Sequence, residues 1–184
     1  EETDGYTYDP KFPTPTKGGC NCCMPELVAW GAYDQRSVEI RNDVLVYTSD
    51  PLREDIEVTG PVVVKLHAST DCKDTDFTAK LVDVHPDGYA VNLCDGIIRG
   101  RYRESTSEQV MLEPGEVYEF TIDLWPTSNV FLKGHRIRVD ISSSNFPRFD
   151  RNLNTGGKFG DETEMRVGNQ SVYHDRAYPS HILL

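Results

Sequence analysis

Strict alternation of apolar and polar residues is the feature that most constrains the fold of this chain. From Tyr118 to Leu124 every second residue is apolar, and the residues between them are Glu119, Thr121 and Asp123. A period of two places successive side chains on opposite faces of an extended strand, whereas an amphipathic helix needs a period of about 3.6. No long stretch of the chain repeats apolar residues at helical spacing. We therefore expect an all-β protein.

Turn residues separate further segments of the same kind. The segment Asp74–Val84 alternates, the tripeptide Pro86–Gly88 follows it, and a second run begins at Tyr89. Asp-Gly favours a tight turn because Gly accepts positive φ, so these two runs predict a hairpin. Further strands are expected at Val44–Thr48, at Val62–Ala68 after a turn at Gly60-Pro61, at Arg136–Ile141 with one apolar and one wet face, at Ser171–His174 and at His181–Leu184. Strands at this spacing indicate two packed antiparallel sheets.

Length and amino-terminal composition bound the domain organisation. A chain of 184 residues can bury a core without a metal or disulfide, so we expect a single domain over residues 1–184. Residues 1–42 are expected to form an extended strap leading into the sandwich, because the start of the chain is rich in Pro, Thr and Gly. Tyr6, Tyr8 and Phe12 are its aromatic anchors.

The charge balance argues against nucleic acid as a partner. The formal net charge is −11, whereas binding to phosphate needs a cationic surface. We expect no membrane association, because no apolar run approaches the length of a membrane span. The amino terminus, EETDGYTYDP, lacks the basic start and apolar centre of a secretion signal, and a start without Met suggests a fragment or a processed chain.

Five cysteines raise the question of a metal or disulfide framework. Cys20, Cys22 and Cys23 lie in the short stretch CNCC, whereas Cys72 and Cys94 stand alone. Zinc sites usually need a second pair of ligands at matching spacing, which this chain lacks, and an odd number excludes complete pairing. We expect reduced cysteines acting as small apolar residues, no metal and no cofactor. Reduced cysteines favour a cytoplasmic location.

No catalytic motif of a self-contained hydrolase is present. The sequence contains no GxSxG nucleophile elbow. Ser142-Ser143-Ser144 follows a strand, with His135 and Asp140 nearby, but neighbouring side chains on a strand point to opposite faces. We expect these serines to bond to the backbone.

Acidic and histidine residues offer two weaker candidates for metal binding. Asp71, Asp74 and Asp76 carry oxygen ligands suited to calcium, but they lack the remaining positions of a calcium loop, so solvated acids are expected. The histidines show no HxH or HExxH spacing, and each is expected to be structural; they are His67, His85, His135, His174 and His181.

Ordered motifs along nearly the whole chain resemble one known family. They are YTYDP, PTPTKGG, CC, DQR, DVLVYTSDPL, DTDFTAKLVDVHPDG, CDGIIRGRYR, SNVFLKGHRIRVDISSSNFPRFDRNLNTGG and PSHILL. The chain resembles the carboxy-terminal domain of the X-Pro dipeptidyl-peptidase and cocaine-esterase-like serine hydrolases. The resemblance implies a galactose-binding-like jelly roll, attached in that family to a helical cap and to an α/β-hydrolase domain, which carries the catalytic Ser, Asp and His.

What the resemblance implies for this chain is a non-catalytic accessory domain. It would brace the catalytic domain of a parent serine hydrolase with esterase, acylase or X-Pro dipeptidyl-peptidase activity, and help shape its substrate cleft. The stretch Cys20–Met24 would lie toward the entrance of the acyl pocket. The candidate cleft or interdomain residues are therefore Cys20, Cys22, Cys23, Met24 and Trp30, and no catalytic residue is expected here.

Two other functions and the oligomeric state stay open at this point. The jelly roll also serves independent carbohydrate-binding modules, in which Trp30 or Trp125 would stack on a sugar. A self-contained esterase is the least favoured reading, since no elbow is present. An accessory domain that packs on a catalytic domain should expose apolar surface. The candidates are the aromatic residues of the amino-terminal strap and the segment Leu27–Tyr33. An oligomer of the parent polypeptide stays open.

Overall fold

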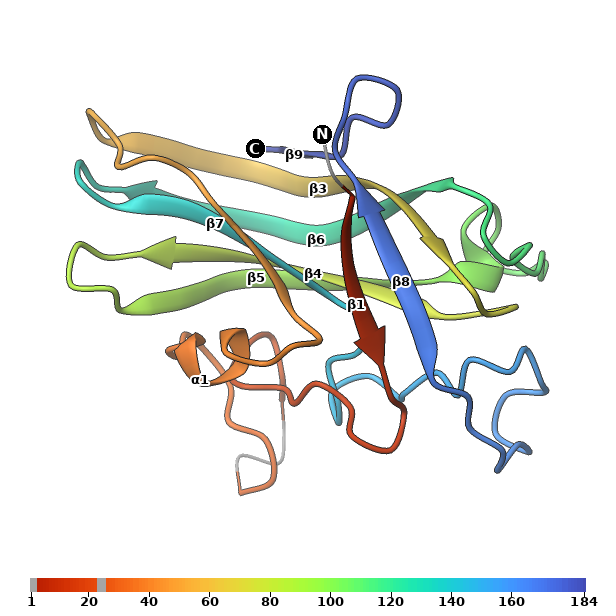
Figure 1. The fold of residues 1–184 in the computed structure, drawn as a ribbon. Coiled ribbons are helices and arrows are strands. Elements are labelled where there is room, and N and C mark those ends of the chain that lie inside the picture. Colours follow the sequence, from red (N-terminus) through yellow and green to blue (C-terminus); the bar gives the residue numbers. More distant parts are fainter. Residues whose placement is uncertain (1–2, 23–25) are drawn as a thin grey trace.

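The protein is a sandwich of two antiparallel sheets, seen here in a computed structural model that describes residues 3–22 and 26–184 (Figure 1). One sheet has the order β1-β8-β3-β6, with β9 also paired to β3, and the other has the order β2-β7-β4-β5. The strands are β1 (Asp4–Tyr8), β2 (Leu45–Thr48), β3 (Ile56–Thr70), β4 (Asp76–Val84), β5 (Ala90–Arg99), β6 (Tyr118–Phe131), β7 (Arg136–Ser142), β8 (Gly168–Tyr173) and β9 (His181–Leu183). The predicted all-β sandwich is confirmed.

The core lies between the inner faces of the two sheets. Phe77 and Leu81 of β4 meet Phe120 and Ile122 of β6, and all four are fully buried. The rings of Phe77 and Phe120 lie 4.7 Å apart in a tilted arrangement. Burying such a side chain stabilises the fold by about 1.5–3 kcal/mol each. The alternation that predicted strands therefore also selects the residues of the core.

The strands β3 and β6 continue past the places where the sequence predicted them to begin and end. The Gly60-Pro61 pair does not make a turn; it lies within β3, where the register with β6 shifts between Pro61 and Val63. Gly60 has φ of 146°, which glycine accepts readily, and Pro61 pairs with Pro126. Proline is tolerated in a strand at a bulge, and the predicted turn is wrong for that reason.

The beginning of the expected strap is a strand of the sheet. β1 pairs with β8, and Tyr6 and Tyr8 are buried in the core. The Tyr6 hydroxyl lies 2.8 Å from the hydroxyl of Ser143. Two tyrosines at alternate positions give this short segment an apolar face, so Asp4–Tyr8 joins the sandwich instead of crossing its surface. The predicted late strands form β8 and β9, but β8 lies between β1 and β3 instead of completing an edge.

The outer face of the four-stranded sheet is covered. All nine residues of β4 are buried, including Lys80 on the side that faces away from the core. Part of the cover is the segment between β1 and β2 that contains the four-residue helix α1 (Arg36–Glu39) (Figure 1). Asp140 of β7 is 4% exposed, so the predicted wet face of that strand is wrong at this position.

Candidate functional site

Two segments that form no strands, one after β1 and one after β7, lie along one side of the sandwich (Figure 1). Three contacts join them: Thr16 N–H donates to Phe146 O at 2.7 Å, Phe146 N–H donates to Thr14 O at 3.0 Å, and Arg151 Nη1 donates to Pro10 O at 2.9 Å. We call this surface the loop face and define it as residues 9–22, 26–33 and 145–167. Paired backbone groups hold the two segments side by side, so the two segments have a defined arrangement on the loop face.

Exposed apolar side chains are frequent on the loop face. Phe12 and Leu27 are each 71% exposed, and Phe159 and Trp30 are about half exposed. Apolar side chains that are exposed on one side of a domain can be buried by a partner. The expectation of exposed apolar surface is confirmed for Phe12 and for the Leu27–Tyr33 segment, but it is wrong for Tyr6 and Tyr8, which lie in the core.

A hollow of about 490 Å³ lies on the loop face between the described residues of the Cys20 loop and the turn that follows β7. Its lining residues are Cys20, Asn21, Cys22, Leu27, Val28, Pro147, Arg148 and Phe149. Gly19, which precedes Cys20, exchanges two backbone hydrogen bonds with Gly31, of 2.7 and 2.9 Å. Arg148 is held by an ion pair with Asp95, and its guanidinium lies 4.8 Å from the centre of the Phe149 ring.

The predicted site residues divide between this hollow and its surroundings. Cys20 and Cys22 line it, and Trp30 lies half exposed on the same loop. Cys20 is an exposed free thiol, whereas Cys22 is disulfide-bonded, so the expectation of reduced cysteines is wrong for Cys22. Cys23 and Met24 lie outside the described residues.

Two further cysteines behave as small apolar residues. Cys72 and Cys94 are buried free thiols. Burial raises the pKa of Cys94 to about 12 and the pKa of Cys72 to about 11, so neither thiol forms the reactive thiolate near neutral pH. The predicted role of these two residues is confirmed.

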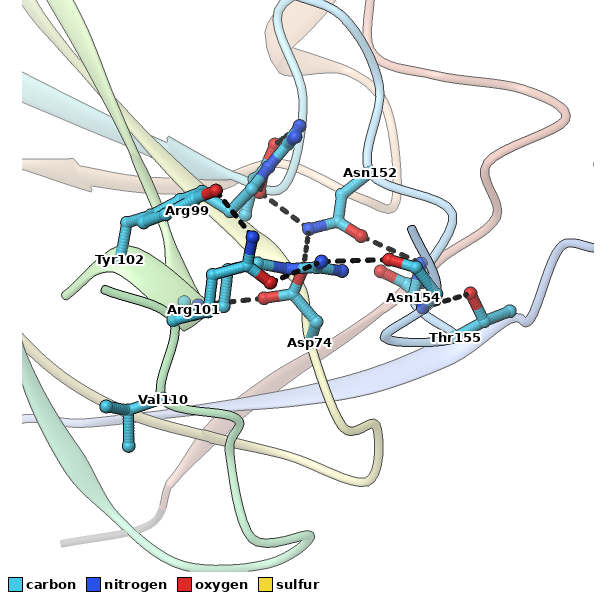
Figure 2. A network of polar contacts seen from close by, with 12 residues as sticks. Asp74, Arg99, Arg101, Tyr102, Val110, Asn152, Asn154 and Thr155 are labelled. Carbon is cyan, nitrogen blue, oxygen red and sulfur yellow. Dashed lines mark hydrogen bonds and ion pairs between the residues drawn. The ribbon is translucent and has the colours of Figure 1, made fainter. Parts of the chain in front are cut away.

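A buried polar network anchors the far part of the loop face (Figure 2). Arg101 Nε donates to Asp74 at 2.7 Å, and Arg99 binds Asp76 through two hydrogen bonds, of 2.9 and 3.0 Å. Asn152 donates to both carboxylates, at 2.7 and 2.8 Å. The network therefore ties the loop at 150–157 to the start of β4 and the end of β5.

The network overturns the prediction of solvated acids at Asp74 and Asp76. Both are 0–1% exposed, and burial raises the pKa of Asp76 while the bonds from Arg99 oppose that shift. Calcium is not needed to neutralise them, because two guanidinium groups already do so. The signal that the sequence offered was the pattern of alternate arginines in RGRYR, since strand pairing sets Arg99 opposite Asp76.

The serines at the end of β7 and directly after it are structural, as predicted. Ser142 Oγ donates to Asp43 O at 2.7 Å, and Ser144 Oγ accepts from Thr14 N–H at 2.6 Å. His135 contacts Asp83 at 2.9 Å instead of any of these serines. The candidate trio of Ser, His and Asp140 therefore does not assemble.

Comparison with known proteins assigns the chain to a family. Residues 7–183 match the X-Pro dipeptidyl-peptidase C-terminal non-catalytic domain. The chain belongs to this family. The resemblance seen in the motifs is thereby confirmed, and a non-catalytic domain agrees with the absence of a nucleophile elbow from the sequence. The comparisons give no support to an independent carbohydrate-binding module.

The relatives of this X-Pro dipeptidyl-peptidase C-terminal domain are longer proteins. It is 49% identical over 186 residues to cocaine esterase from Rhodococcus sp. (strain MB1 Bresler), an alignment that covers 100% of this chain and 32% of that protein. An aminopeptidase from the marine sediment archaeon Thaumarchaeota archaeon matches 100% of this chain and 33% of its own, with a TM-score of 0.87 and 35% identity. An α-amino acid ester hydrolase has a TM-score of 0.87 and 33% identity, covering 99% of this chain and 32% of its own. The chain thus spans about a third of the length of these relatives.

Among the described residues, no helix is long and apolar enough to cross a membrane.

Proposed function

We propose that this chain is the accessory domain of a serine hydrolase that acts on esters or amides, and that its loop face docks on the catalytic and cap domains of the same polypeptide. The observation that carries the proposal is the group of exposed apolar side chains on the loop face: Phe12, Leu27, Trp30 and Phe159. Membership of a non-catalytic domain family, with relatives about three times as long, supports the same conclusion. Interfaces within a chain bury apolar side chains of this kind.

The hollow beside Cys20 is proposed as the part of this surface that reaches the substrate cleft. Cys20 and Cys22 line it together with the apolar side chains of Leu27, Val28 and Phe149, so it offers an apolar border to an acyl group. Trp30 lies on the same loop. Cys23 and Met24, which follow Cys22 in the sequence, are proposed to belong to the same side of the cleft. The printed names of the relatives, an esterase, an amino acid ester hydrolase and an aminopeptidase, support acyl or aminoacyl substrates.

The parent activity is tested on the native polypeptide. An antibody against this chain should detect a band about three times heavier than 20.8 kDa, in keeping with the share of the relatives that it covers. The same band should react with a fluorophosphonate probe, which labels activated serines. A band at the mass of this chain that takes no label would contradict the proposal.

The docking surface is tested by charge placement in the intact polypeptide. Leu27→Glu and Phe12→Glu should lower the thermal midpoint and the rate of ester hydrolysis, because a charge buried in an apolar interface is costly. Trp125→Glu is the matched control, since Trp125 is 67% exposed and lies on β6 outside the loop face. Equal effects of Leu27→Glu and Trp125→Glu would rule out docking through the loop face.

Cys20 offers a direct readout of what covers the hollow. Its thiol should react with a maleimide in the separate chain and should be protected in the intact polypeptide. A large side chain there, Cys20→Trp, should raise KM for long acyl esters more than for acetyl esters, because it narrows the cleft. An equal change of KM for both esters would contradict the placement of Cys20 at the cleft.

A further inference from the structure

Two turns meet at one end of the sandwich, away from the loop face (Figure 1). The β4–β5 turn carries His85, and the β6–β7 turn carries His135. Backbone hydrogen bonds fix both residues: His85 N–H donates to Tyr89 O at 2.8 Å, and His135 N–H donates to Leu132 O at 3.0 Å. A third bond, from Leu52 N–H to His135 O at 2.8 Å, joins the second turn to the segment after β2. The two imidazoles therefore project from rigid positions.

Asp83 completes a cluster with these two histidines. One possible ligand atom from each of the three residues lies within 4.8 Å of the other two. His135 Nδ1 lies 2.9 Å from Asp83 Oδ1, and the two imidazole rings lie 4.4 Å apart, tilted by 33°. Asp83 is 7% and His135 is 9% exposed, whereas His85 is half buried at the mouth of the cluster. The arrangement is thus partly enclosed and open on the side of His85.

The donor set suits a borderline divalent cation. Two imidazole nitrogens and one carboxylate oxygen are the ligands of many zinc sites, which leave a fourth position for water or substrate. Two atoms bound to one tetrahedral zinc ion lie about 3.4 Å apart, given bonds of about 2.1 Å. The cluster must therefore contract by about 1.4 Å at its widest, and rotation of the His85 ring can supply this.

The contacts of His85 leave its ring able to turn. Among the described residues, the ring makes no hydrogen bond or ion pair and contacts only two other rings, those of His135 and Tyr89. The Tyr89 ring lies edge-on at 5.4 Å. The ion pair between Asp83 and His135 alone would account for those two residues, but it gives no role to a second imidazole stacked against the first. A shared cation gives all three groups a partner.

We propose that Asp83, His85 and His135 bind one divalent ion of the Zn²⁺ class. The ion joins the β4–β5 turn to the β6–β7 turn, and it bridges two segments that are 50 residues apart in the sequence. Sequence spacing could not show this site, because its histidines belong to different turns and form no short motif.

The test compares metal binding by the intact polypeptide and by single variants. After removal of metals with a chelator, the protein is titrated with Zn²⁺ in competition with a chromophoric chelator, and then with Co²⁺, whose visible absorption reports a tetrahedral site. His85→Ala should bind one ion fewer per chain, or bind it at least about tenfold more weakly, and should lose the Co²⁺ band. This variant removes a half-buried ring, so the fold should persist, which circular dichroism checks.

The matched control is His181→Ala, which removes an exposed histidine on β9 whose ring bonds to Pro179 O at 2.7 Å. It should bind metal as the unmodified protein does. A conservative second variant, Asp83→Asn, should weaken Zn²⁺ binding while it keeps the shape of the side chain. Equal stoichiometry and affinity in the unmodified protein and in His85→Ala, or no Zn²⁺ binding by either, would overturn the proposal.

Discussion

The outer faces of the two sheets differ although their strands alternate in the same way. Lys80 on β4 and Lys65 on β3 each point away from the core. Lys80 is 6% exposed and donates to Gln35 Oε1 at 3.1 Å, whereas Lys65 is solvent-accessible and donates to Glu119 at 3.0 Å and to Thr121 at 2.8 Å. The difference shows that alternation identifies the face that is apolar, and leaves open what covers the other one.

The cover over the four-stranded sheet encloses a row of charges. Strand register places Lys80 beside Asp140 on one neighbour and beside Asp95 on the other. Helix α1 lies over this row, with Glu39 accepting from Arg138 at 2.7 Å. Burial raises the pKa of Asp140 to about 7 and lowers the pKa of Lys80. On the five-stranded sheet the side chains of Lys65 and Glu119 are 30% and 49% exposed, so their ion pair contributes less to stability.

The largest difference in the cost to unfolding free energy is expected between substitutions of Asp95 and of Glu119. Asp95 accepts from Asn145 at 2.7 Å and pairs with Arg148, so Asp95→Ala leaves a nearly buried guanidinium without its partner and should cost about 3–5 kcal/mol of unfolding free energy. Glu119→Ala on the open face should cost about 0–1 kcal/mol. Denaturant unfolding measures both, and equal costs would abolish the distinction between the two faces.

The stability contributed by Asp140 and the stability contributed by Glu119 should change with pH in opposite directions. The pKa of Asp140 is raised from 3.8 to about 7, so the folded state binds a proton that the unfolded chain releases, and the stabilisation is lost as the pH rises from about 4 to 7. Asp140→Asn should remove that loss, on the order of 2–4 kcal/mol between these pH values. Unfolding curves at several pH values measure it.

The control for this prediction is Glu119→Gln. The bond from Lys65 lowers the pKa of Glu119, so its small contribution is present above the usual carboxyl pKa and is lost as the pH falls. A parallel response of Asp140→Asn and Glu119→Gln would show that Asp140 is not shielded from water.

The smallest expected effect is a difference in the rate at which Lys65 and Lys80 react with a reagent in solution. Lys65 should react with an amine-specific acylating reagent in the folded protein, whereas Lys80 should react only after unfolding, because the segment around α1 covers it. Mass spectrometry of the peptides gives both rates in one sample. Modification of Lys80 at the rate of Lys65 would mean that the cover opens readily in solution.

Much of the fold followed from residue patterns. The hairpin at Pro86–Gly88 and the alternation in β6 placed the central strands, because the period of two and the turn chemistry are local properties. The bulge at Gly60-Pro61 was missed, since the same pair makes turns elsewhere and only pairing with Pro126 distinguishes the two outcomes.

The candidate sites were less accessible to sequence reasoning. The region of Cys20 and Trp30 came from the family resemblance, and its exposure came from the structure. The Arg99–Asp76 and Arg101–Asp74 pairs depend on side chains more than 20 residues apart, which strand register brings together. The cluster of Asp83, His85 and His135 depends on two turns that the sequence does not connect.

The sequence by itself determined the strands, the apolar faces and the family, because each rests on short-range patterns or ordered motifs. The tertiary structure alone decided which polar residues lie in water. Lys80, Asp140, Asp74 and Asp76 are polar residues whose local context gives no sign of burial, and what buries them is a helix, a loop or an arginine from a distant segment. The free energy of a charge depends on what surrounds it in space, and a linear sequence records only its neighbours along the chain.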